Sequence, residues 1–107
     1  MNTKLKELNL VYRKLKLSDY QKFKKLFYSC FKKKITYNFF KWRYFDDKHS
    51  FCYGVFESSK LIANVGMKAM KLNYKKNKII YSRHSSMVLG NYRGIGIFSE
   101  LLKKVKK

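Results

Sequence analysis

Three strand-like segments with short connections lie in the middle of the chain and limit the folds open to it. Apolar residues concentrate at 51–57, 61–71 and 78–89, and the intervening connections are Ser58-Ser59-Lys60 and residues 73–77. Connections this short join neighbouring antiparallel strands, because a parallel pair needs a crossover of roughly a dozen residues or more. The sequence therefore predicts an antiparallel meander whose first turn is a tight hairpin.

A strand and a helix precede the meander. Residues 9–16 alternate in the manner of a half-buried strand. Over 19–33 the apolar residues recur every three or four positions, which predicts a helix with one apolar face and a lysine-rich face toward water. Ser18 and Gln21 have the spacing of a capping box, so we expect Ser18 to begin this helix.

Two further helices complete the pattern. Thr36 can cap a short helix that runs to about residue 45, and residues 94–106 place their apolar side chains on one face of a last helix. The predicted order is β-α-α-β-β-β-α, an α+β fold with a mainly antiparallel sheet and three helices, in one domain over 1–107. We expect the strand at 78–89 to lie exposed at one edge of that sheet.

The charge of the chain is extreme, and its distribution affects the interpretation. The 107 residues carry 26 Lys and Arg against 6 Asp and Glu, a net charge of +20 that is typical of proteins that bind nucleic acids or acidic membranes. Few of these cations are Arg, the side chain best suited to bases and phosphates, and the lysines are spread along the whole chain. This favours a generic solvated surface that binds polyanions weakly and non-specifically. A basic nucleic-acid-binding module without enzymatic activity stays as the alternative.

Membrane, secreted and metal-dependent classes receive no support from the sequence. No run of about 18 apolar residues is present that could span a membrane, and the residues from Met1 to Lys6 lack the apolar core of a signal peptide. Cys30 and Cys52 lie far apart without a CxxC spacing, and the two histidines have no cysteine or carboxylate at ligand spacing. We therefore expect a cytoplasmic protein with no disulfide framework and no metal site.

The segment from Tyr92 to Phe98, YRGIGIF, joins the last strand to the last helix. The first amides of a helix have no partner within it, and the helix dipole makes that end partly positive. Gly94 and Gly96 let an anion approach the backbone without meeting a Cβ, and Arg93 adds a full charge. The segment fits a phosphate or pyrophosphate, or it is simply a tight turn. A Rossmann fingerprint is excluded because its third glycine is missing, and a Walker loop because no Gly-Lys-Ser/Thr is present.

The same segment resembles the acetyl-CoA loop of the GNAT N-acetyltransferases. Their motif A is a strand, then Arg/Gln-x-x-Gly-x-Gly/Ala, then a helix. Arg93-Gly94-Ile95-Gly96 matches the Arg-Gly-x-Gly form of this motif, whereas Phe98 stands where a second small residue is usual. Upstream, FFKWRYFDD and YGVFESSKLIANVG are similar to segments of one branch of this superfamily. The predicted order of strands and helices is also that of the N-terminal half of the GNAT fold, through motif A.

The resemblance implies an activity and a set of binding residues. It implies transfer of an acyl group from acetyl-CoA to an amine-bearing acceptor, by direct attack of the amine on the thioester while the protein orients the reactants and polarises the carbonyl. The strand before the loop would pair with the amides of the pantetheine arm, and the loop would hold the pyrophosphate. The implied cofactor-binding residues are Met87, Val88, Leu89, Arg93, Gly94, Ile95, Gly96, Ile97 and Phe98.

Three further residues have more than one interpretation. His84 shares a face of its strand with Ser86, upstream of the implied acyl site, and is either a candidate general base or a half-buried histidine without a catalytic role. Trp42 and Tyr44 lie in an aromatic segment with helical periodicity, which favours core packing over a base-stacking surface. In the related family this region also borders the acceptor pocket.

A complete GNAT domain continues beyond the motif A helix, whereas this sequence ends at Lys107, within or at the end of that helix. We therefore expect an incomplete domain. It is a fragment of a longer product, a half completed by a second chain or oligomer, or a remnant without activity. The strand at 78–89 would then have an open edge that can pair with another chain.

Overall fold

Four antiparallel strands form one sheet in which spatial order follows sequence order. The computed structural model describes residues 9–73 and 78–105. The strands are β1 (Leu10–Lys14), β2 (Phe51–Glu57), β3 (Lys60–Asn73) and β4 (Lys78–Val88), in the order β1-β2-β3-β4. Among the described residues β4 pairs with β3 alone, so the predicted meander and its open edge strand are both confirmed.

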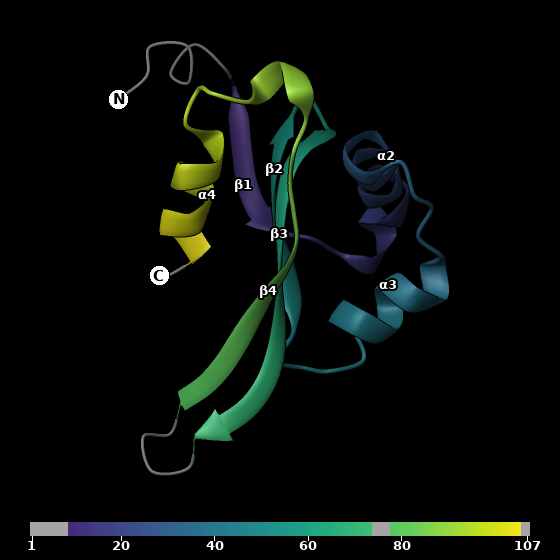
Figure 1. Cartoon of the computed structure of the whole chain (residues 1–107), viewed down its shortest axis with the longest axis vertical. Helices are drawn as coiled ribbons and strands as arrows, with labels where there is room; N and C mark the ends of the chain where they lie inside the picture. The colour runs from purple at the N-terminus through teal and green to yellow at the C-terminus, as the bar shows by residue number, and fades with distance from the viewer. Residues whose placement is uncertain (1–8, 74–77, 106–107) are drawn as a thin grey trace.

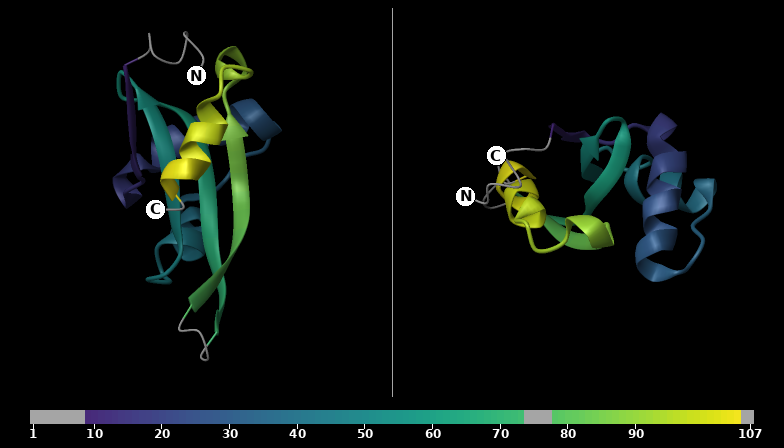
Figure 2. Two further views of the ribbon diagram at one scale, coloured as in Figure 1. Left: turned by 90° about the vertical axis from the view of Figure 1, so that its left-hand side faces the viewer. Right: turned by 90° about the horizontal axis from the view of Figure 1, so that it is seen from above.

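Helices cover both faces of this sheet. α2 (Tyr20–Phe31) and α3 (Tyr37–Tyr44) pack on one face, and α4 (Ile97–Val105) packs on the other (Figure 1), as the two views of Figure 2 also show. Two short 3₁₀ turns, η1 (Leu17–Asp19) and η2 (Gly90–Tyr92), precede α2 and follow β4. The three helices and the α+β class agree with the sequence prediction. None of the described helices is long and apolar enough to cross a membrane.

The sheet separates two apolar cores, one on each face. Against α2 and α3 the core is largely aromatic, with Phe23 and Phe40 fully buried and their ring centroids 4.6 Å apart. Against α4 the buried residues are aliphatic, with Ile62 of β3 in the same cluster as Ile97 and Leu101 of the helix. The apolar stripes predicted for the first and last helices supply these contacts.

The approach to α2 differs from the prediction. α2 begins at Tyr20, with no capping hydrogen bond from a side chain, so the capping box predicted for Ser18 is wrong. The carboxylate of Asp19 organises this turn instead. It accepts a hydrogen bond from the backbone N–H of Lys16 at 2.7 Å and two from the guanidinium of Arg13 at 2.8 and 3.1 Å. Asp19 therefore accepts the backbone N–H that precedes η1, and its ion pair with Arg13 ties this turn to β1.

The other helix starts divide between confirmation and correction. Thr36 caps α3 as expected, with its Oγ1 accepting from the N–H of Phe39 at 3.2 Å. α4 begins at Ile97 and not at residue 94, because Gly94 and Gly96 have φ of +82° and +88°, outside the range of a right-handed helix.

The connection between β2 and β3 is the tight hairpin expected at Ser58-Ser59-Lys60. Ser58 and Ser59 have φ of 49° and 71°, the left-handed values that a two-residue turn needs to match the twist of its strands. Glu57 pairs with Lys60 across the turn. The second predicted connection, at 73–77, lies outside the described residues after Asn73.

α3 buries one side of an aromatic helix and exposes the other. Phe40 and Tyr44 are 0% and 1% exposed, whereas Phe39 and Trp42 are 43% and 56% exposed. The prediction of core packing is confirmed for Tyr44 and wrong for Trp42. A short helix that lies on a sheet turns a single face to it, so aromatic residues on the opposite face remain in water.

Candidate functional site

The loop after β4 has an open, glycine-lined backbone. β4 ends at Val88, η2 follows, and Arg93 leads into Gly94 and Gly96 before α4 begins. Both glycines have positive φ, where residues with a side chain are strained. A Cβ built at either position would meet no atom within 4 Å. The loop therefore leaves its backbone accessible to a ligand.

At the start of α4 the side chains pack in the core, while the first backbone N–H groups have no partner within the helix. The N–H of Glu100 bonds to the carbonyl of Gly96 at 3.1 Å, so the N–H groups of the first three helical residues lie ahead of the helix's own hydrogen bonds. Ile97 is 1% exposed and Phe98 is half-buried, and both pack in the core against the sheet. The helix end thus presents partial positive charge beside the glycine backbone.

The end of β4 turns part of its backbone to the open edge. The carbonyl of Val88 accepts a hydrogen bond from Nε of Arg93 at 3.0 Å and lies 3.6 Å from Sγ of Cys30, and neither group belongs to β3. The N–H of Leu89 bonds instead to the carbonyl of Ile62 at 2.8 Å, within the sheet. Backbone groups of an edge strand alternate between partner and solvent. Val88 is one of the three residues expected to pair with pantetheine, and its backbone carbonyl therefore points away from β3.

A β-bulge interrupts the pairing of β3 and β4 near the middle of the sheet. The register shifts between the pair Gly66–His84 and the pair Asn64–Met87, so one residue of β3 stands opposite two of β4. Ser85, one of these two, has a φ of +51°. Bulges of this kind redirect side chains and end regular pairing, and they are common beside active sites.

The bulge changes which residues share a face. His84 contacts Arg43 and the next residue, Ser85, contacts Tyr44, so two successive residues of β4 both meet α3. A regular strand would put them on opposite faces. The extra residue breaks the alternation on which the prediction that His84 and Ser86 share a face depended, so that prediction stays untested.

A buried polar network holds the bulge. The hydroxyl of Tyr44 lies 2.9 Å from Oγ of Ser85, and Nδ2 of Asn64 donates to the carbonyl of Ser85 at 3.2 Å. Burial raises the pKa of Tyr44, so its hydroxyl keeps its proton and can donate. Gly66 makes room for this ring, because a Cβ there would lie 2.5 Å from the hydroxyl oxygen. Sequence reasoning missed this network, although a glycine inside an apolar strand is a signal of close approach.

His84 lies at the contact between β4 and α3. Its Nδ1 accepts a hydrogen bond from Nη2 of Arg43 at 2.5 Å, which puts the ring proton on Nε2. Burial lowers the pKa of His84, and the charges of Arg43 and Lys68 lower it further, so the ring is neutral at neutral pH. The Nδ1 lone pair that a general base would use is occupied by the guanidinium in this arrangement.

Thiols and metal ligands add no second centre in the described part of the chain. Cys30 and Cys52 are free, and burial raises the pKa of Cys52, which makes that thiol unreactive. Within residues 9–73 and 78–105 no group of three or more His, Cys, Asp or Glu side chains could hold a metal ion.

Comparison with protein families decides the relationship that the loop suggested. A model of the acetyltransferase (GNAT) domain matches residues 11–107. The chain belongs to the GNAT acetyltransferase family. The match includes the bulge, the glycine loop and α4, and it confirms the resemblance drawn from the sequence. A comparison with curated protein sequences gives no match.

Solved structures of GNAT proteins share the fold. A GNAT family acetyltransferase from Staphylococcus aureus superposes with a TM-score of 0.69 and 19% identity, over 91% of this chain and 75% of that one. A possible acetyltransferase from Clostridium difficile gives 0.71 and 17%, over 91% and 68%. Glucosamine-6-phosphate N-acetyltransferase from Arabidopsis thaliana gives 0.66 and 19%, over 92% and 72%. At these identities the likeness establishes the fold.

Proposed function

We propose that this chain binds acetyl-CoA as part of an N-acetyltransferase that passes the acetyl group to an amine. The observation that carries the proposal is the loop at Arg93–Gly96 of a GNAT domain, where two glycines at positive φ face open space at the N-terminus of α4. A pyrophosphate suits this backbone, because helix amides and the exposed Arg93 supply positive charge where no side chain intrudes. The family match favours this function over a nucleic-acid-binding module.

The open edge of β4 supports the remainder of the binding site. The outward carbonyl of Val88 can accept from an amide of a pantetheine arm as a neighbouring strand would, once Arg93 releases it. Acetyl-CoA, when bound, supplies an acetyl group activated as a thioester. The residues of this chain would bind and orient that group, and the bulge at Ser85 interrupts regular strand pairing just before the end of β4.

The acceptor is an amine in this proposal, and its proton needs a base. His84 is the candidate, since its ring is neutral at neutral pH, but Arg43 must release Nδ1 before that atom can accept a proton.

Two free thiols in the described structure are in keeping with function in the reducing cytoplasm.

The test is titration with coenzyme A by calorimetry, with two pairs of matched variants. Gly96→Val places a branched side chain at positive φ in the open loop, whereas Gly90→Val adds the same atoms where neither strain nor contact opposes them. Arg93→Glu reverses a charge in the loop, and Arg83→Glu makes the same change at an exposed position of β4.

We expect the two loop variants to weaken coenzyme A binding at least about tenfold and the two controls to change it less than about twofold. Full affinity in folded Gly96→Val would mean that the loop is a turn without a binding role, and the proposal would fail where it is strongest.

A further inference from the structure

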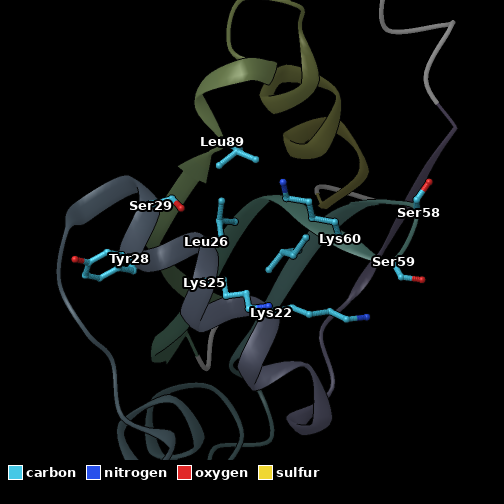
Figure 3. Close-up of a pocket in the computed structure, with 10 residues that line it drawn as sticks. Lys22, Lys25, Leu26, Tyr28, Ser29, Ser58, Ser59, Lys60 and Leu89 are labelled. Carbon is cyan, nitrogen blue, oxygen red and sulfur yellow. The ribbon is translucent and has the colours of Figure 1, made fainter.

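A cavity lies on the face of the sheet opposite α4. It has a volume of about 590 Å³, which is within the range of about 300–1,000 Å³ typical of small-molecule sites. Its walls come from α2, the β2–β3 hairpin and the residue after β4 (Figure 3). Leu26, Leu61 and Leu89 supply the apolar part of the lining. The cavity can therefore take the apolar body of a ligand.

The polar part of the lining is cationic. Lys22 and Lys25 approach from α2 and Lys60 from the hairpin, and Figure 3 shows Lys60 extending toward Leu89 on the side of the cavity opposite the two helix lysines. No acidic side chain is among the described residues that line the cavity. Three ammonium groups around one apolar floor favour an anion, because each ammonium is a compact charge that binds phosphate well.

The two acidic residues nearest in sequence to the cavity lining, Asp19 and Glu57, already interact with other side chains. Asp19, whose pKa the Arg13 guanidinium and the Lys16 amide lower, is held by that guanidinium on the β1 side of α2. Glu57 accepts a hydrogen bond from the hydroxyl of Tyr92. Neither carboxylate lines the cavity, but the charge of Lys22 helps to lower the pKa of Asp19, so the site depends mainly on Lys25 and Lys60.

The hairpin places two hydroxyl groups at the rim with backbone strain. Ser58 and Ser59 both line the cavity, and both hold left-handed φ, a conformation that disfavours residues with a side chain. Asn-Gly would make the same two-residue turn more readily. Backbone strain that persists at the rim of a cavity indicates that the side chains there have a function, such as ligand binding.

We propose that this cavity binds a small organic phosphate. The phosphate lies among the lysines and the hairpin hydroxyls, and the organic part lies on the three leucines. The site is separate from the glycine loop, which stands at the N-terminus of α4 on the other face of the sheet. Leu89 packs against both cores, so it links the cavity to the end of β4.

Phenyl phosphate is a suitable probe, with phenol and inorganic phosphate as its two halves. Titration is followed by amide NMR shifts and calorimetry at about 0.15 M salt, where long-range surface attraction is largely screened. We expect saturable shifts at the hairpin and α2, and tighter binding of phenyl phosphate than of either half. The double variant Lys25→Gln/Lys60→Gln should bind at least about tenfold more weakly. Lys24→Gln/Lys48→Gln removes the same charge outside the cavity and should bind within about twofold of the parent.

A hairpin variant separates binding from folding. Ser58→Asn with Ser59→Gly should raise the melting temperature by relieving strain, and yet weaken phenyl phosphate binding by removing the hydroxyls. Gly96→Val should bind phenyl phosphate normally whether or not the loop binds coenzyme A. Equal losses in the two lysine pairs would overturn the proposal, as would unchanged binding in the Lys25/Lys60 variant or loss of binding in folded Gly96→Val.

Discussion

Gly66 and Gly96 lie in the two regions that the GNAT function would use, and they are glycines for opposite reasons. At Gly66 a Cβ would collide with the buried Tyr44 ring at 2.5–2.7 Å, so the absent side chain lets the protein pack against itself. At Gly96 a Cβ would meet nothing within 4 Å, but φ is +88°, so the glycine permits a backbone shape that leaves space empty. The stability of the bulge region should therefore depend on side-chain volume at Gly66. The loop should instead depend on the backbone conformation of Gly96 and on the ligand that it binds.

The largest effect should come from Gly66→Ala. The new Cβ meets the ring of a residue that is 1% exposed and cannot swing into solvent, so we expect a loss of about 3 kcal/mol in the free energy of unfolding. Urea denaturation measures it, with Gly90→Ala as a control that should be near zero because nothing lies within 4 Å of its Cβ.

A double-mutant cycle with Tyr44→Leu sharpens this test. Removing the ring should abolish most of the additional loss caused by Gly66→Ala, because the colliding atoms are gone. Additive losses would show that the glycine is needed for something other than this contact.

Phe98→Ala should have the next largest effect, and on stability rather than on binding. The side chain is half-buried in the core under α4, so the loss should be about 2 kcal/mol, below the 3–5 kcal/mol of a fully buried Phe. Coenzyme A affinity per folded molecule should change little, since the loop backbone is unaltered. A tenfold loss of coenzyme A affinity, measured by calorimetry, would contradict the view that Phe98 stabilises the core while the loop backbone binds the ligand.

Gly96→Ala should reduce stability by about 1 kcal/mol, because an L-residue is strained at this φ although space is free. The urea midpoint checks this against Gly90→Ala, which adds the same methyl group close by without a positive φ. An unchanged urea midpoint would show that the loop can adopt another backbone conformation without a loss in the free energy of unfolding.

The smallest expected effect is a pH dependence from His84. Its pKa in the folded state lies below the ordinary value of 6.5, so the unfolded chain binds the proton more readily. The stability from the neutral ring is full above about pH 6.5 and is lost as pH falls through that value toward the folded pKa. Urea midpoints at about pH 7.5 and 5.5 should differ less in His84→Gln than in the parent. His49→Gln, at an exposed turn, should keep the parent's difference.

Prediction from sequence was accurate where a single segment carries the signal. The meander, the Ser58-Ser59 hairpin and the Thr36 cap are each encoded within a few residues, and the structure has all three. The error at Ser18 arose because the chain enters α2 through the 3₁₀ turn η1, which contains Ser18, so α2 begins only at Tyr20. Asp19 in this turn pairs with Arg13, and that ion pair depends on where β1 lies.

The sequence by itself determined the order of elements, the antiparallel sheet and a glycine-containing turn before the last helix, each from periodicity or from the backbone freedom of nearby residues. The GNAT family came from the resemblance of that turn to motif A, which the family match confirmed. The tertiary structure alone decided the bulge at Ser85, its support by Tyr44 and the cationic cavity beside Leu89. Tyr44 and Ser85 are 41 residues apart, and a contact over that separation leaves no periodic trace in either segment. It forms because packing of α3 on the sheet buries Tyr44 against the bulge, and a buried hydroxyl needs a hydrogen-bond partner, which Ser85 supplies.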